Sequence, residues 1–160
     1  MNEKILEILE SNCSLPIEQI ALLCSSTVEE VSDAIESMKK NKIILGNKSI
    51  INWEKTDKEF VTALIELKVT PQRGEGFDRI AERIYQFPEV KTLYLMAGAF
   101  DLTVIIEGKT MKEVAMFVAS RLAPMDFVVS TSTHFVLKNY KYEGIVFDDG
   151  QQDTRQVIAF

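Results

Sequence analysis

The sequence predicts an α+β protein built from two modules, a small helical head and a larger module of strands and helices. Over the first 52 residues, apolar residues recur at intervals of three and four, which is the period of a helix. From residue 59 onward, stretches that alternate apolar and polar residues are interleaved with helical stretches. The short polar stretch 53–58 separates the two patterns and is the expected linker.

The head contains three short helical patterns and a possible hairpin. The third pattern begins at Thr27, because Thr27 and Glu30 have the spacing of a capping box. Behind it, residues 43–45 and 49–51 flank a glycine turn and are expected to pair as a β-hairpin. Three helices followed by a hairpin indicate a winged helix-turn-helix over residues 1–52.

The larger module, residues 59–141, is expected to follow the order strand, helix, strand, strand, helix, strand. Strands are expected at residues 59–69, 90–97, 100–107 and 128–137. This order is the ferredoxin-like (ACT-like) arrangement, in which two helices cover one face of four antiparallel strands. Residues 142–160 form a C-terminal extension that is expected to be an extra strand or an arm at an interface.

The expected strands carry apolar residues on both faces. In the second strand, Tyr94 and Met96 point opposite to Leu93 and Leu95, and in the third strand Ile105 points away from its apolar neighbours. An isolated antiparallel sheet with helices on one face would leave the other face in water. Large exposed apolar surfaces usually mark interfaces. We therefore expect a homo-oligomer with dimers as its unit, in which a second sheet covers the open face.

Composition and missing motifs narrow the classes of function. The chain has 160 residues, of which 46% are hydrophobic and 26% charged, as in ordinary soluble proteins. No apolar run reaches the roughly 18 residues that span a bilayer, so we expect a cytoplasmic protein with no membrane partner. Cys13 and Cys24 stand outside any metal-binding spacing, so no metal or cofactor is expected. The single histidine, His134, has no evident catalytic partner, and no catalytic motif is present, which favours a protein that is not an enzyme.

The segment Gly98-Ala99-Phe100-Asp101-Leu102-Thr103-Val104 resembles a pattern of the Lrp/AsnC family of bacterial and archaeal regulators, G-x-[YF]-D-hydrophobic, between the second and third strands of its sensor domain. Residues 87–90, 108–110 and 131–138 also match that family. The resemblance covers residues 1–141. It implies dimers that often assemble into octamers, double-stranded DNA as a partner, amino acids or related metabolites as effectors, and control of amino-acid metabolism.

The sequence departs from this family where DNA would be read. Residues 1–58 contain no arginine and hold 7 lysines against 10 acidic residues. Acidic residues repel phosphate, although a carboxylate can accept a hydrogen bond from cytosine. The candidate DNA-binding residues are the polar residues at the start of the recognition helix and the lysines near its end: Ser26, Thr27, Ser32, Lys39, Lys40, Lys42 and Lys48. These lysines either contact phosphate or form a solvated helix end.

The candidate effector site surrounds the turn before the third strand. Asp101 could hold the ammonium group of an amino acid while exposed backbone amides take its carboxylate; alternatively, Asp101 only caps the turn. Gly98 is expected to supply a backbone shape that a side chain would block. The candidate effector-binding residues are Met96, Ala97, Gly98, Phe100, Asp101, Thr131 and Thr133. The two threonines could instead be ordinary β-branched strand residues.

Three functions are compatible with these features. The expected one is a DNA-binding transcriptional regulator that responds to an amino acid or related metabolite. The second is an effector-sensing or assembly protein with a weak or vestigial DNA-binding module, acting through protein partners or hetero-oligomers. The third is an enzyme, because proteins resembling this architecture include sirohaem decarboxylases; those need histidines around a tetrapyrrole, and this chain has one histidine.

Overall fold

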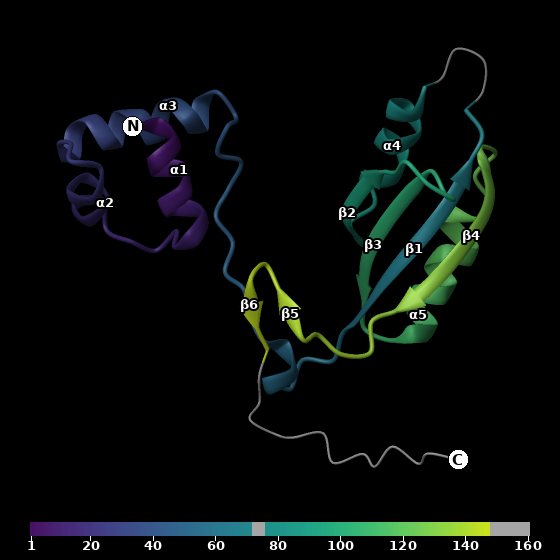
Figure 1. The fold of residues 1–160 in the computed structure, drawn as a ribbon. Helices are drawn as coiled ribbons and strands as arrows, with labels where there is room; N and C mark the ends of the chain where they lie inside the picture. The colour runs from purple at the N-terminus through teal and green to yellow at the C-terminus, as the bar shows by residue number, and fades with distance from the viewer. Residues whose placement is uncertain (72–75, 148–160) are drawn as a thin grey trace. The chain divides into compact units, whose positions relative to one another are not determined.

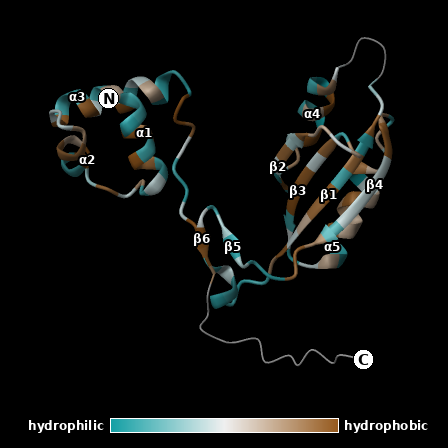
Figure 2. Ribbon diagram, in the orientation of Figure 1, coloured by the Kyte–Doolittle hydropathy of each residue, from teal (hydrophilic) through white to brown (hydrophobic). Residues whose placement is uncertain are grey.

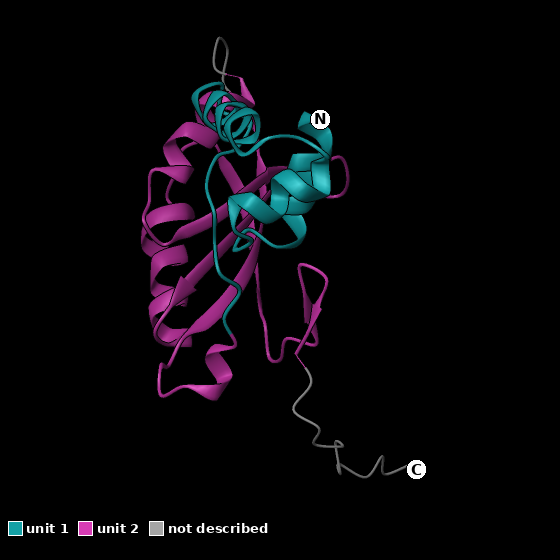
Figure 3. Cartoon of the chain, turned by 90° about the vertical axis from the view of Figure 1, so that its left-hand side faces the viewer, with its two compact units in different colours: residues 1–51 teal, residues 52–160 magenta. Residues whose placement is uncertain are grey.

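The computed structural model describes residues 1–71 and 76–147, and Figure 1 shows the arrangement of the elements. The chain divides into two compact units, unit 1 (Met1–Ile51) and unit 2 (Asn52–Phe160), which are coloured separately in Figure 3. None of the helices among the described residues is long and apolar enough to cross a membrane.

Unit 1 is a bundle of three helices, α1 (Asn2–Ser11), α2 (Ile17–Cys24) and α3 (Val28–Lys40). Each helix turns one apolar stripe inward, as its spacing of apolar residues predicts. The buried side chains that form the small core are Ile5, Ile20, Ala21, Val31 and Met38. The three predicted helices of the head are therefore confirmed.

The predicted hairpin of unit 1 is wrong. Residues 43–51 form no strand, because the first of them complete the end of α3. Lys42 adopts the left-handed conformation (φ 56°), and the amides of Ile43 and Ile44 both donate to the carbonyl of Met38, at 2.9 and 3.2 Å. This is the geometry that ends helices when one residue turns left-handed. Ile44 then packs on the three-helix core, and the following residues run on without cross-strand hydrogen bonds.

Unit 2 contains a four-stranded antiparallel sheet. Its strands are β1 (Val61–Val69), β2 (Val90–Leu95), β3 (Leu102–Gly108) and β4 (Val128–Phe135), and their spatial order is β2-β3-β1-β4. A short 3₁₀ turn, η1 (Trp53–Lys55), precedes β1. The β-α-β-β-α-β order and the α+β fold class predicted from the sequence are both confirmed.

Two helices cover one face of this sheet (Figures 1 and 3). They are α4 (Phe77–Tyr85) and α5 (Met111–Phe117), and α5 continues as a π-helical turn, η2 (Val118–Leu122). Alternate residues of the central strands meet these helices, and Figure 2 shows the apolar character of β1 and β3. The side chains of the sheet that are almost completely buried beneath the helices are Ala63, Ile65, Leu67, Leu102, Val104 and Ile106.

The opposite face of the sheet, which we call the open face, carries the remaining side chains of the strands. Cross-strand pairing places Tyr94 beside Thr103, and Ile105 beside Leu64, on this face. Tyr94 is 54% exposed, whereas Leu64 and Ile105 are half-buried by their neighbours. As the alternation in the sequence predicts, the open face is therefore partly apolar, and none of the described helices of this unit lies against it.

The C-terminal extension begins with a small hairpin, β5 (Lys141–Tyr142) and β6 (Ile145–Val146). Its two turn residues, Glu143 and Gly144, both have positive φ (46° and 80°), which is the conformation of a type I′ turn. This hairpin is a two-stranded sheet of its own, so its strands do not extend the four-stranded sheet. The rest of the extension, residues 148–160, lies outside the described residues.

Packing of the central strand should dominate the stability of unit 2. Ile65 is fully buried beneath the helices, so I65A should lower the free energy of unfolding by about 2–5 kcal/mol through lost burial and a residual cavity. Leu137 is 86% exposed, and L137A should change stability by no more than about 0.5 kcal/mol. Urea unfolding of both variants tests the assignment, and equal effects would contradict it.

Candidate nucleic-acid interface and effector site

The connection between α2 and α3 is a tight turn fixed by backbone hydrogen bonds. Ser25 adopts the left-handed conformation (φ 52°), and the amide of Ser26 donates to the carbonyl of Ala21 at 3.0 Å. This pattern ends α2 after Cys24 and redirects the chain within three residues into α3. Together, α2, the turn and α3 form a helix–turn–helix. In proteins that bind DNA with this motif, the second helix is the recognition helix.

The start of α3 is held by the capping box that the sequence predicted. Thr27 Oγ1 accepts from the amide of Glu30 at 3.2 Å, and the Glu30 carboxylate accepts from the amide of Thr27 at 3.1 Å. The Ser26 hydroxyl also donates to the Glu30 carboxylate. These bonds hold the pKa of Glu30 below its ordinary value, and the Ser26 bond contributes most, followed by the Thr27 amide. Ser26 and Thr27, two candidate DNA-binding residues, therefore also build the helix start.

The solvent-facing side of α3 is acidic. Residues at intervals of four, three and four lie along one line of a helix, and on α3 that line consists of Glu29, Asp33, Glu36 and Lys40, all exposed. We call it the outer line of α3. Within the described part of the chain, its three carboxylates take part in no hydrogen bond or ion pair. Ser32 lies half-buried beside this line, and Glu30 is engaged in the helix cap.

The candidate lysines gather at the C-terminal end of α3. Lys39 and Lys40 occupy its last turn, and Lys42 follows in the left-handed position that ends the helix. All three are exposed, and so is Lys48 in the extended segment beyond. Cations are favoured at a helix C-terminus, so part of this cluster has a structural use. The same exposure leaves the four ammonium groups available to phosphate.

The candidate effector loop connects β2 to β3 and is tied to the end of β1. The amide of Met96 donates to the carbonyl of Asp101 at 2.7 Å, which closes the loop. The amide of Asp101 donates to the carbonyl of Leu67 at 3.0 Å, and Asp101 Oδ2 accepts from the amide of Val69 at 2.8 Å. One oxygen of Asp101 therefore fixes the loop to the end of β1. Its second oxygen, Oδ1, accepts no hydrogen bond within the described residues.

The predicted reason for Gly98 is wrong. A Cβ atom built at Gly98 would meet no heavy atom within 4 Å, and its φ is not positive. A side chain at position 98 would therefore meet no obstacle among the described residues, because the loop tip is exposed. Met96, Ala97 and Gly98 all lie at this exposed tip, and Phe100 is half-buried behind it. The open space at Gly98 allows a ligand or a second chain to approach the backbone closely.

The two candidate threonines of β4 do not join this loop. Thr131 pairs with Leu67 and Thr133 with Ile65, so both threonines point to the helix-covered face with those buried residues. β1 lies between β4 and β3, which separates the threonines from the loop by two strand spacings, about 10 Å. The structure therefore brings together residues 96–101 of the candidate effector site and leaves Thr131 and Thr133 apart.

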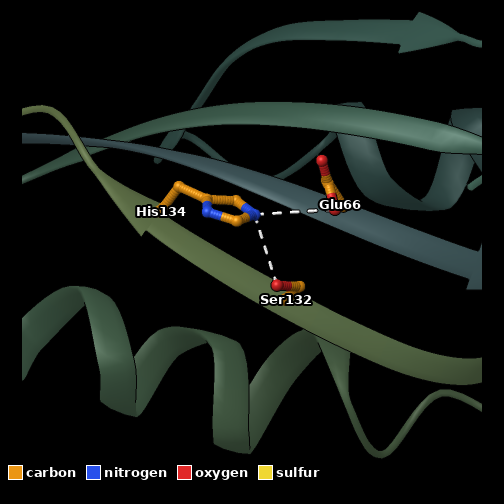
Figure 4. A network of polar contacts seen from close by, with 3 residues as sticks. All are labelled: Glu66, Ser132 and His134. Carbon is orange, nitrogen blue, oxygen red and sulfur yellow. Dashed lines mark hydrogen bonds and ion pairs between the residues drawn. The ribbon is translucent and has the colours of Figure 1, made fainter.

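Sequence reasoning missed a polar cluster on the open face of the sheet. Glu66 of β1 contacts His134 of β4, with 3.5 Å between Glu66 Oε2 and His134 Nε2, and His134 Nε2 lies 3.2 Å from Ser132 Oγ (Figure 4). The alternation of polar residues within each strand was visible in the sequence, but the register between strands was not. No group of three histidine, cysteine, aspartate or glutamate side chains within the described ranges is placed to hold a metal ion.

These two units define a class of protein: a helix-turn-helix module joined to a small α+β sensor module. Residues 62–146 match the family model of the Lrp/AsnC ligand binding domain. The chain is 48% identical over 157 residues, 98% of its length and 95% of the relative's, to the uncharacterized HTH-type transcriptional regulator YugG of Bacillus subtilis. The chain therefore belongs to the Lrp/AsnC family of transcriptional regulators, and the resemblance seen in the sequence is confirmed.

Solved structures share the fold. The crystal structure of PH0061 has a TM-score of 0.76 at 19% sequence identity and covers 90% of this chain and 95% of its own. The complex of transcriptional regulator NMB0573 with L-Met, from Neisseria meningitidis, has a TM-score of 0.69 at 19% identity and covers 88% of this chain and 90% of its own. At this identity the likeness shows the α+β fold that the sequence predicted.

The capping box should set both the stability and the acid response of unit 1. T27A removes the acceptor for the Glu30 amide and should destabilise α3 by about 1 kcal/mol. Because folding lowers the pKa of Glu30, its ionised carboxylate stabilises the folded state above pH 4.5, and this contribution is lost as the pH falls through the lower folded value. E30Q should therefore flatten the loss of stability below pH 4.5.

Hydrogen exchange of the α3 amides, followed against pH, measures both effects. T110A is the matched control, because Thr110 Oγ1 caps α5 in unit 2 by accepting from the Glu113 amide at 3.1 Å. It should speed exchange in α5 and leave α3 unchanged. Equal protection of α3 in T27A and in the unmodified protein would contradict the assigned role of the cap.

Proposed function

We propose that this chain is a dimeric DNA-binding transcriptional regulator that acts in the cytoplasm, with unit 1 contacting DNA and the 96–101 loop of unit 2 responding to an amino acid or related metabolite. The observation that carries the proposal is the helix–turn–helix of unit 1, with a capped second helix, on a chain of the Lrp/AsnC family. Regulators of this kind combine a reading helix with phosphate contacts that fix its position.

Phosphate contact is assigned to the lysine cluster at the end of α3, that is, to Lys39, Lys40, Lys42 and Lys48. The outer line of α3 bears three carboxylates, which repel the phosphates of DNA. Attraction to the phosphates is therefore assigned to the lysines. Two chains bring two such clusters, which supports a dimer as the binding species. Each neutralised phosphate releases counterions and makes binding weaker as salt rises.

Replacing the four lysines by glutamine should abolish most DNA binding and flatten its salt dependence. The slope of log K against log salt is about −0.9 per phosphate contact, so loss of two clusters reduces it by up to about 7. The measurement is binding to the DNA upstream of the chain's own gene across a salt series. K109Q together with K112Q, two exposed lysines of unit 2, is the control and should bind as the unmodified protein does.

A second candidate function is favoured by the outer line of α3. Glu29, Asp33 and Glu36 present an acidic surface where DNA-reading helices usually carry donors. On this reading the DNA module is vestigial and the protein acts through protein partners or mixed oligomers. No DNA binding by the unmodified protein at low salt, with retained effector binding and self-association, would favour this second function over the first.

An amino-acid effector is proposed from the geometry of the 96–101 loop. The Oδ1 atom of Asp101 is available to an ammonium group, and the exposed backbone around Gly98 is available to a carboxylate. The Neisseria regulator NMB0573, whose structure resembles this chain, is a complex with L-Met. The proposal treats the protein as a sensor rather than an enzyme, since the named relatives are regulators.

A thermal-shift screen of the twenty amino acids should find at least one that stabilises unit 2. At a hundredfold excess over its dissociation constant a ligand adds about 2.7 kcal/mol to stability. D101N keeps an oxygen for the Val69 amide but loses the charge, so it should fold and bind that amino acid more weakly; D126N, exposed after η2, should bind normally. A chain that no amino acid stabilises would contradict this assignment.

A further inference from the structure

Asp33 is the residue of α3 that helix stability explains least. It is exposed in the middle of the helix, and its carboxylate takes part in no hydrogen bond or ion pair among the described residues. Aspartate is also a weaker helix former than glutamate or lysine. Glu29 precedes it by four residues and Glu36 follows it by three, and like charges at such spacings destabilise a helix. The fold of unit 1 therefore gives no reason for a carboxylate at position 33.

The two neighbouring carboxylates differ from Asp33 in this respect. Glu29 stands in the first turn of α3, where the helix dipole favours an acidic side chain. Glu36 precedes Lys40 by four residues, in the order in which glutamate and lysine stabilise a helix. Helix stability thus accounts for both ends of the outer line of α3. What the helix binds must account for its centre.

The position of Asp33 suits contact with bases in the major groove. α3 is the second helix of the helix–turn–helix, and in such proteins the N-terminal part of that helix contacts base edges. A rise of about 1.5 Å per residue places Asp33 about 6 Å beyond Glu29 along the axis, and Lys40 about 10 Å beyond Asp33. The major groove is about 12 Å wide. Asp33 can therefore face bases inside the groove while Lys40 lies near the phosphates at its edge.

We propose that Asp33 is a specificity-determining residue that reads cytosine in the major groove, by accepting a hydrogen bond from its N4 amino group. The proposal rests on the DNA-binding function proposed above and deepens it. A carboxylate only accepts hydrogen bonds, and cytosine offers a donor there. Guanine offers two acceptors and thymine an acceptor and a methyl group, so neither suits a carboxylate. Adenine places an acceptor beside its donor, which suits an amide better.

The same carboxylate weakens binding to DNA of other sequences. Where no amino group faces Asp33, its charge stays near the phosphates without a donor, and the repulsion counts against that sequence. Residues 1–58 contain no arginine, so non-specific attraction through this part of the chain depends on lysines. Asp33 therefore raises the ratio of specific to non-specific affinity, which is the quantity that selects one site in a genome.

The test is a selection of bound duplexes from a pool of random-sequence DNA by the full-length chain, followed by sequencing. The unmodified protein should enrich sites with a fixed cytosine. Asparagine keeps the shape of aspartate but both donates and accepts, which matches N6 and N7 of adenine. D33N should therefore exchange that cytosine for adenine and leave the other selected positions unchanged. D33E keeps a carboxylate and should keep the cytosine.

Binding constants on single duplexes give a second measurement. Replacing the selected cytosine by thymine should weaken binding by the unmodified protein about tenfold or more, and binding by D33N much less. D33N should bind unrelated duplexes more tightly than the unmodified protein does, because a repelling charge is gone. A merely structural residue would change binding to all duplexes alike. E7Q, the control on the exposed side of α1, should keep both the selected sequence and the discrimination.

The outcomes separate this proposal from the proposed function. If D33N and the unmodified protein select the same sequence, or if the selected site has no fixed cytosine, the proposal is overturned and the DNA-binding regulator stands. If the unmodified chain binds no duplex of the pool even at low salt, the regulator function fails and this proposal fails with it. Far-ultraviolet circular dichroism checks that D33N and D33E keep their helices.

Discussion

The described helices of unit 2 cover one face of its sheet and leave the other open, and the account of the molecule depends on this asymmetry. The helix-covered face buries the apolar side chains that hold the unit together, with Ile65 and Val104 at its centre. On the open face, Tyr94 is exposed, and Leu64 and Ile105 are half-buried by neighbouring side chains with no described helix over them. In the dimer expected from the sequence, a second copy would bury that surface and add hydrophobic free energy to stability.

The proposed dimer bears on how unit 1 would bind DNA. The outer line of α3 repels phosphate, and the lysines that could offset this repulsion are four in each chain. In the proposed dimer, two chains would bring two lysine clusters and two α3 helices to two half-sites on DNA. An effector bound at the exposed 96–101 loop could act on the same assembly.

Much of the fold could be predicted from the sequence, because periodicity reports which face of each element is buried. The helices of unit 1 and all four strands of unit 2 followed this rule. The hairpin at residues 43–51 did not, since its first residues complete the end of α3 through the left-handed Lys42. Thr131 and Thr133 were grouped with Asp101 because strand register, which places β1 between them, cannot be read from one strand. The polar cluster of Glu66, Ser132 and His134 was missed for the same reason.

The most direct measurement is the absolute molar mass of the unmodified chain in solution, obtained by light scattering over a dilution series from low micromolar concentrations upward. A dimer built on the open face predicts a mass of at least twice the 18.1 kDa of one chain throughout the series. A folded protein that scatters as a single 18.1 kDa chain would contradict the central claim, because its open face would then be stable in water.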